Sequence, residues 1–215
     1  MAYRSGEDYT ILVVCTGNVC RSPAIERLLR SAFVAGSGID VHSAGTGALV
    51  GEPVQPPMVK LLQRHGVTAD GFAARALTEP MVSGADLVLT ATRAHRADVV
   101  ERVPAAVRRT FTVRELARMA EAVDPAELDA AAGADARPAE RLAALVPLAS
   151  RQRAQVPAEL DDVVDPYRRS EEVYEESFGQ LLLAVRTIAR TVLGVRAAGS
   201  VRVEPSTGFS TRSRH

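Results

Sequence analysis

Short apolar runs rich in β-branched residues alternate along the chain with stretches in which apolar residues recur at helical spacing. The runs predict strands at residues 10–14, 39–43, 86–90 and 108–113. The other stretches predict helices or helical turns at residues 22–36, 57–65, 79–83 and 93–102. Strands that alternate with helices favour a parallel sheet covered on both faces. We therefore expect an α/β fold of three layers, a four-stranded parallel sheet flanked by helices.

The second half of the chain predicts further helices. Within an Ala-, Arg- and Glu-rich segment, helices are expected at residues 114–122, 125 onward and 139–148. Asp124, a following proline and Glu127 form a capping box for the middle helix. A longer amphipathic helix is predicted at residues 170–193.

These elements predict one domain over residues 10–195, with an atypical helical insertion at about residues 114–160. Residues 1–9 are expected to be a flexible N-terminus, and residues 196–215, which lack periodicity, a disordered tail. The sequence does not decide whether the insertion is a lid, an interface or filler, and it indicates no oligomeric state.

The composition limits the classes of partner. Lys and Arg total 26 of 215 residues, as do Asp and Glu, so the formal net charge is zero. This balance gives no electrostatic reason to expect nucleic acid or an anionic membrane. No apolar run reaches the length of a membrane span, and the N-terminus lacks the apolar segment of a signal peptide. We expect a cytoplasmic protein without membrane insertion, whose two close cysteines serve chemistry rather than a structural disulfide.

The segment CTGNVCRS, from Cys15 to Ser22, lies between the first predicted strand and a helix with Ser22 as N-cap followed by a proline. Unpaired N–H groups and the helix dipole at such an N-terminus attract an anion. Gly17 lets the backbone approach a phosphate, and Asn18 tolerates a left-handed conformation. Arg21 can donate two parallel hydrogen bonds to phosphate oxygens. Because the same field stabilises a thiolate, the segment predicts a phosphate-binding loop with Cys15 as nucleophile.

At these residues the chain resembles the low-molecular-weight protein tyrosine phosphatase family of bacterial type. VCTGNVCRSP matches the family signature at the matching place near the N-terminus. The resemblance continues with Ser43–Thr46, Asp86–Leu89 and Val164–Tyr167, and it covers roughly residues 10–113 and 160–194. A cysteine six positions before an arginine is common by chance, whereas the combination of these motifs is highly specific.

The resemblance implies a role for each matching residue. Cys15 would attack phosphorus, and Arg21 with the backbone of residues 16–21 would hold the phosphoryl oxygens. Asp165 would protonate the leaving oxygen and then take a proton from water. The substrate-binding residues would be Thr16, Gly17, Asn18, Val19, Cys20, Ser22, Leu49 and Tyr167. No metal or other cofactor would be needed.

Two of these side chains would also act on the loop itself. The Ser22 hydroxyl would bond the Cys15 sulfur and help it leave during hydrolysis, and Asn18 would brace the loop together with Ser43.

Several aspartates compete for the role of general acid. Asp165 precedes a proline, which restricts it to extended conformations, and it stands before the final helix on a loop that can overhang the site. Asp124 is explained as a helix cap, and Asp161 and Asp162 are expected to be solvated loop charges. Asp165 is therefore the predicted acid.

The second cysteine and the histidines have simpler interpretations. Cys20 either fills space beside the loop or forms a reversible disulfide with Cys15 against overoxidation, a use that the resemblance supports. His42, His65 and His95 fall on different predicted elements, so no metal site is expected.

The substrate is predicted from the rim of the site. A deep pocket suits phosphotyrosine, and Tyr167 can stack on its ring. Val19 is apolar, as in tyrosine-directed members, whereas arginine phosphatases of the family tend to carry threonine there. The resemblance of GALVG (residues 47–51) and DPYRRS (165–170) to one bacterial branch implies a tyrosine kinase of exopolysaccharide or capsule synthesis as a partner. Phosphoarginine hydrolysis is the alternative.

Two other functions that use a similar loop would require different residues. A thioredoxin-coupled arsenate reductase needs cysteines downstream, and none follows Cys20. A non-catalytic phosphate-binding module predicts loss of Cys15, Arg21 or Asp165, and all three are present. The chain departs from the family pattern at Phe72, where many members carry histidine, and at Gln55, where aspartate is common.

Overall fold

The computed structural model describes residues 8–133, 135–153 and 158–194. At its centre is the predicted parallel sheet, with strand order β2–β1–β3–β4. The strands are β1 (Tyr9–Cys15), β2 (Ile39–Gly45), β3 (Leu87–Thr90) and β4 (Thr110–Thr112). The α/β fold is thus confirmed, while the predictions for residues 1–7 and 196–215 lie outside the described residues.

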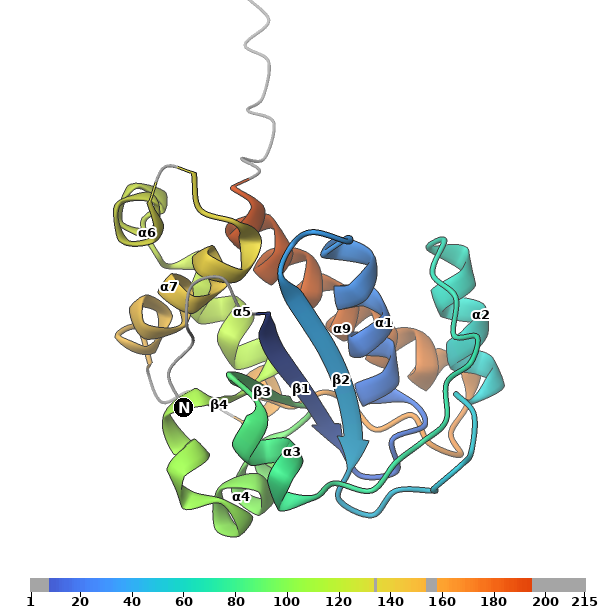
Figure 1. Ribbon diagram of the computed structural model, residues 1–215. Helices are drawn as coiled ribbons and strands as arrows, with labels where there is room; N and C mark the ends of the chain where they lie inside the picture. Colours follow the sequence, from blue (N-terminus) through green and yellow to red (C-terminus); the bar gives the residue numbers. More distant parts are fainter. Residues whose placement is uncertain (1–7, 134, 154–157, 195–215) are drawn as a thin grey trace, which may run out of the picture.

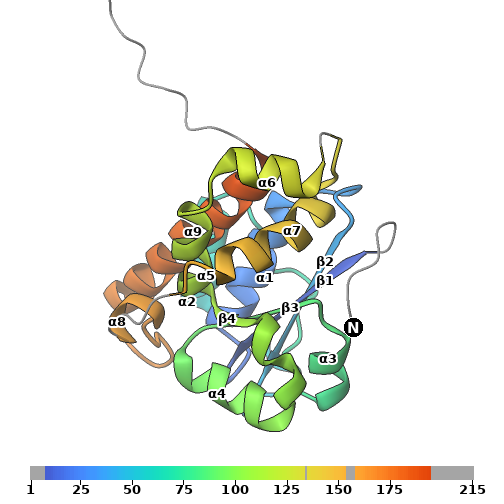
Figure 2. The same ribbon diagram turned by 90° about the vertical axis from the view of Figure 1, so that its left-hand side faces the viewer.

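Helices cover both faces of the sheet (Figure 1 and Figure 2). Because side chains alternate along β1, Ile11 and Val13 pack into one core and Leu12 and Val14 into the other. The larger core lies beneath α1 (Arg21–Ala32), α2 (Pro56–Arg64), α5 (Val113–Glu121) and α9 (Glu171–Leu193). The smaller core lies beneath α3 (Glu79–Gly84), α4 (Arg93–Arg102) and the 3₁₀ helix η1 (Pro104–Arg109).

The segment at residues 114–160, which is predicted to be an insertion, packs into the larger core. After α5 it forms α6 (Pro125–Ala132), α7 (Pro138–Ser150) and α8 (Ala158–Asp161). Leu116, Leu128 and Leu142 are each no more than 1% exposed and belong to the same core as Ile11 and Ile25. Burying such side chains contributes roughly 1.5–3 kcal/mol each, so residues 114–160 share the hydrophobic core of the sheet. Among the described residues, no helix has the length and apolarity to span a bilayer.

The predicted N-cap of α1, Ser22, is wrong by two residues. The helix begins at Arg21, its N-cap position is Cys20, and no side chain caps it. The Ser22 hydroxyl is engaged elsewhere: it accepts a hydrogen bond from Asn18 Nδ2 and lies 2.9 Å from Cys15 Sγ. Its contacts with the loop replace the predicted cap.

The fourth strand is shorter than residues 108–113. Residues 104–109 form η1, and α5 begins at Val113. Thr112 accepts a hydrogen bond from the backbone N–H of Glu115, and the Glu115 carboxylate accepts one from the backbone N–H of Thr112. This capping box starts the helix before the strand can extend. The predicted cap of α6 by Asp124 is confirmed, with Oδ1 accepting from the Ala126 N–H at 2.9 Å, but Glu127 does not complete the predicted capping box and pairs with Arg151 Nη1 at 3.0 Å instead.

Candidate active site

Backbone hydrogen bonds join the loop that follows β1 to the chain that follows β2. Asn18 has φ 54°, the left-handed conformation expected of it. The Gly47 N–H donates to Thr16 O and the Leu49 N–H to Gly17 O, each at 3.0 Å. A Cβ at Gly45 would lie 2.3 Å from Thr16 O, so only glycine permits this approach. The two loops therefore form one rigid unit.

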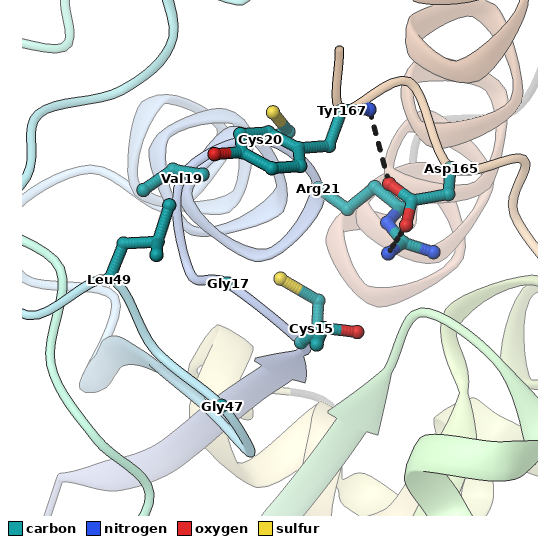
Figure 3. Close-up of a pocket in the computed structure, with 10 residues that line it drawn as sticks. Cys15, Gly17, Val19, Cys20, Arg21, Gly47, Leu49, Asp165 and Tyr167 are labelled. Carbon is teal, nitrogen blue, oxygen red and sulfur yellow. Dashed lines mark hydrogen bonds and ion pairs between the residues drawn. The ribbon is translucent and has the colours of Figure 1, made fainter. Parts of the chain in front are cut away.

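The Cys15 sulfur lies at the end of β1 and points into a cavity (Figure 3). Its Sγ is 2.9 Å from Ser22 Oγ. Because Asn18 already donates to Ser22 Oγ, the hydroxyl proton of Ser22 is available to the sulfur.

A chain of buried polar groups lies beneath the loop. Asn18 Nδ2 also donates to Ser43 Oγ at 2.9 Å, and Asn18 Oδ1 accepts from the Arg75 N–H. Ser43 Oγ in turn donates to Glu26 Oε2 at 2.6 Å. Asn18 and Ser22 are fully buried here and do not line the cavity.

Glu26 was not singled out from the sequence. It is 2% exposed and lies 3.5 Å from Arg30 Nε. The signal available was its spacing, four residues after Ser22, which places the two side chains on the same face of α1.

Arg21 and Asp165 meet at one side of the cavity. Arg21 Nη2 lies 2.8 Å from Asp165 Oδ2, and Asp165 Oδ1 accepts from the Tyr167 N–H at 3.2 Å (Figure 3). Arg21 is 4% exposed, whereas the Asp165 side chain is 54% exposed. A fixed guanidinium and a more accessible carboxylate thus face the same space.

The cavity has a volume of about 140 Å³. Its walls combine the phosphate-binding loop, the chain after β2 and the loop before α9. The lining residues are Cys15, Thr16, Gly17, Val19, Cys20, Arg21, Gly47, Leu49, Asp165 and Tyr167. Gly47 was not predicted among them. Val19, Leu49 and Tyr167 give the side opposite Arg21 an apolar wall (Figure 3).

Cys20 is a buried free thiol in the same loop, as is Cys15. Its Sγ lies 3.6 Å from Tyr174 Oη, and Cys20 lines the cavity together with Cys15. Burial raises the pKa of Cys20 to about 12. Cys20 is therefore a neutral thiol near neutral pH, in contrast to what a nucleophile requires.

His95 contacts the loop, which the sequence reading missed. Its Nε2 lies 2.8 Å from Thr16 Oγ1 and its Nδ1 2.7 Å from Thr92 Oγ1. Burial, followed by the positive charge of Arg21, lowers the pKa of His95 to about 4. A neutral imidazole thus links α4 to the phosphate-binding loop. Among the described residues, no three His, Cys, Asp or Glu side chains are grouped to hold a metal ion.

The depressed pKa of His95 predicts a pH-dependent stability. Between an unfolded-state pKa of about 6.5 and the folded value of about 4, only the unfolded chain binds this proton. The free energy of unfolding should therefore fall as pH decreases through this window, by up to about 3 kcal/mol from His95 alone. Denaturant unfolding of wild type and His95→Asn at pH 4–7 measures it. Parallel curves for the two proteins would contradict the assignment.

Comparison with protein families identifies the domain. The family model described as low molecular weight phosphotyrosine protein phosphatase matches residues 10–132. A probable low molecular weight protein-tyrosine-phosphatase, EpsP, of Ralstonia nicotianae is 41% identical over 107 residues, which are 50% of this chain and 72% of EpsP. The low molecular weight protein-tyrosine-phosphatase Etp of Escherichia coli is 39% identical over 116 residues, 54% of this chain and 76% of Etp.

A solved structure extends the similarity beyond the matched segment. The YwlE arginine phosphatase from Geobacillus stearothermophilus superposes with a TM-score of 0.60 at 25% identity. The superposition covers 86% of this chain and 94% of YwlE. The fold is therefore shared with both tyrosine and arginine phosphatases.

Proposed function

This chain belongs to the low molecular weight phosphotyrosine protein phosphatase family, and from that premise we propose that it hydrolyses phosphotyrosine in proteins through a phosphocysteine intermediate. The observation that carries the proposal is the convergence of Cys15, Arg21 and Asp165 on one small cavity. These groups supply a nucleophile, a binding site for phosphoryl oxygens and a proton donor.

In the first step the Cys15 thiolate attacks phosphorus, the S–P bond forms and the bond to the tyrosine oxygen breaks. Arg21 and the N–H groups of the loop balance the charge on the phosphoryl oxygens. A phosphoryl group that binds the Arg21 guanidinium would compete with Asp165 for hydrogen bonding to Arg21 Nη2. Asp165, released and protonated, would donate its proton to the leaving phenolate.

In the second step water hydrolyses the phosphocysteine. The Asp165 carboxylate takes a proton from water, the water oxygen attacks phosphorus, and the S–P bond breaks with its electrons on sulfur. The hydrogen bond from Ser22 Oγ, 2.9 Å from Cys15 Sγ, stabilises the departing thiolate. Phosphate then leaves and the enzyme is regenerated.

The apolar wall supports phosphotyrosine as the substrate. Val19 is buried and lines the cavity, and the Tyr167 ring can stack on a substrate ring. The similarity to YwlE keeps phosphoarginine as a second candidate, because that relative is an arginine phosphatase. The two substrates differ in charge and shape beyond the phosphoryl group, so the wall should discriminate between them.

A substrate protein and a setting follow from the same resemblance. We propose a tyrosine-phosphorylated protein, such as a tyrosine kinase of exopolysaccharide synthesis, and action in the cytoplasm, where Cys15 stays reduced. Residues 10–195 would form the phosphatase domain, which the common core of the insertion and the sheet supports.

Hydrolysis of matched peptides tests the proposal. We expect phosphate release from a phosphotyrosine peptide at least about tenfold faster, in kcat/KM, than from the phosphoarginine peptide. Addition of a chelator should leave the rate unchanged, because the mechanism uses only side chains and backbone. A preference for phosphoarginine, or a chelator-sensitive rate, would refute the proposed substrate or the proposed chemistry, respectively.

A further inference from the structure

The loop that carries Asp165 is tied to the rest of the fold just before the acid. We propose that Asp161, held between Arg93 and Arg118, is a positioning residue that sets where the carboxyl group of Asp165 stands over the cavity. The inference rests on the proposed function, since it concerns the general acid of that reaction.

Asp161 is a buried carboxylate with two cationic partners. It is 3% exposed, so the prediction of a solvated loop charge is wrong. Its Oδ2 accepts from Arg93 Nε at 3.0 Å and Nη2 at 2.8 Å, and its Oδ1 accepts from Arg118 Nη2 at 2.8 Å. The hydrogen bond to Asp161 raises the pKa of Arg93. Three charge-assisted hydrogen bonds fix this carboxylate in one place.

Residues 162–164 are also joined to the rest of the fold by hydrogen bonds. Asp162 Oδ1 accepts from the Arg93 N–H at 2.7 Å, and Arg114 Nη1 donates to Asp162 O at 2.6 Å. The Val163 N–H donates to Ala91 O at 2.9 Å, and the Val164 N–H to Gln180 Oε1 at 3.0 Å. The chain is thus held from α4, α5, the end of β3 and α9.

Asp165 depends on this attachment because little else confines it. The Asp165 side chain is 54% exposed. It forms its ion pair with Arg21, the residue to which the substrate phosphate would bind. Once phosphate binds Arg21, the hydrogen bond from the Tyr167 N–H and the backbone of residues 161–164 set the position of the acid. A misplacement of about 1 Å can cost about 100-fold in rate, so this backbone is part of the catalytic geometry.

The attachment also gives the insertion a role in catalysis. Arg114 and Arg118 are four residues apart on α5, and both reach α8: Arg114 donates to Glu159 O and to Asp162 O just beyond the helix, and Arg118 donates to Asp161 Oδ1. The first helix of the insertion therefore supplies part of the cradle for the acid loop, in addition to its share of the core.

Asp161→Asn tests the proposal with two aryl phosphates. A misplaced acid slows P–O cleavage most when the leaving group needs a proton, as phenolate does more than p-nitrophenolate. We expect kcat/KM to fall about 30-fold for phenyl phosphate and less than about threefold for p-nitrophenyl phosphate. Asp129→Asn is the matched control: it removes an ion pair to Arg141, 2.8 Å long, within the same insertion but away from the acid loop. It should change neither value by more than about twofold.

Hydrogen exchange provides a readout that does not need activity. In Asp161→Asn the Val163 and Val164 amides should exchange at least about tenfold faster, while in Asp129→Asn they should not. Arg118→Met should shift both readouts in the same direction by less, and it serves if Asp161→Asn does not fold.

Equal losses on both substrates, or unchanged exchange at Val163 and Val164, would overturn the inference. An inactive wild-type protein would instead refute the proposed function, and the exchange rates would still decide whether Asp161 holds the segment.

Discussion

Replacing Cys15 with serine is expected to lower kcat for p-nitrophenyl phosphate by at least about 10⁴-fold. A serine hydroxyl is a far weaker nucleophile than a thiolate, and the loop holds no general base that could activate it: its neighbours Ser22 and Asn18 are a hydroxyl and an amide. Steady-state release of p-nitrophenolate by the two proteins measures the effect. Rapid quenching of the wild type should also trap phosphate on Cys15.

Cys15→Ser is a small change, so a loss of activity can be assigned to the missing thiolate and not to a disrupted fold. Serine differs from cysteine by one atom and can keep the contact with Ser22 Oγ, so the fold should persist. Inorganic phosphate should raise the melting temperature of both proteins, because Arg21 and the loop are intact. A variant that keeps more than about 1% of wild-type kcat would exclude Cys15 as the nucleophile.

The phosphate-binding loop could be predicted because its determinants are local. The apolar run of β1, a left-handed position at Asn18 and the N-terminus of α1 follow one another between Tyr9 and Arg21. Such a strand–loop–helix unit has few alternative geometries, so residue types in this order specify where N–H groups and Arg21 point. The four strands and their flanking helices were predictable for a similar reason, the period of their apolar positions.

The residues that the sequence reading missed depend on distant contacts. His95 reaches Thr16 across 79 positions, and Asp161 meets Arg93 across 68. Neither has a local pattern, because the partner is fixed only when β1 and β3 pair and α8 closes over α4 and α5. From the sequence alone, Asp161 is expected to be solvated, because the two arginines that bury it, Arg93 and Arg118, are distant along the chain. Glu26 lies between the two cases, since the spacing from Ser22 was visible but its burial was not.

The substitution Asp165→Asn should affect both roles proposed for this residue, as proton donor to the leaving oxygen and as base for the attacking water. For Asp165→Asn we expect kcat/KM on a phosphotyrosine peptide to fall by about 10²–10³, because the tyrosine oxygen leaves poorly without a proton. The loss with p-nitrophenyl phosphate should be smaller, since its leaving group needs less protonation. The phosphoenzyme should also persist longer in rapid-quench experiments, because Asp165 also serves as the base for water.

Asp124→Asn is the matched control, since Asp124 is likewise followed by proline but caps α6. Asparagine also caps helices well, so stability and both kcat/KM values should stay close to wild type. If Asp165→Asn lost activity equally on both substrates without lengthening the life of the phosphoenzyme, the carboxylate would be acting only through its ion pair with Arg21. Because that ion pair must open when phosphate binds, its removal would change KM for both aryl phosphates, whereas loss of proton transfer appears in the chemical step.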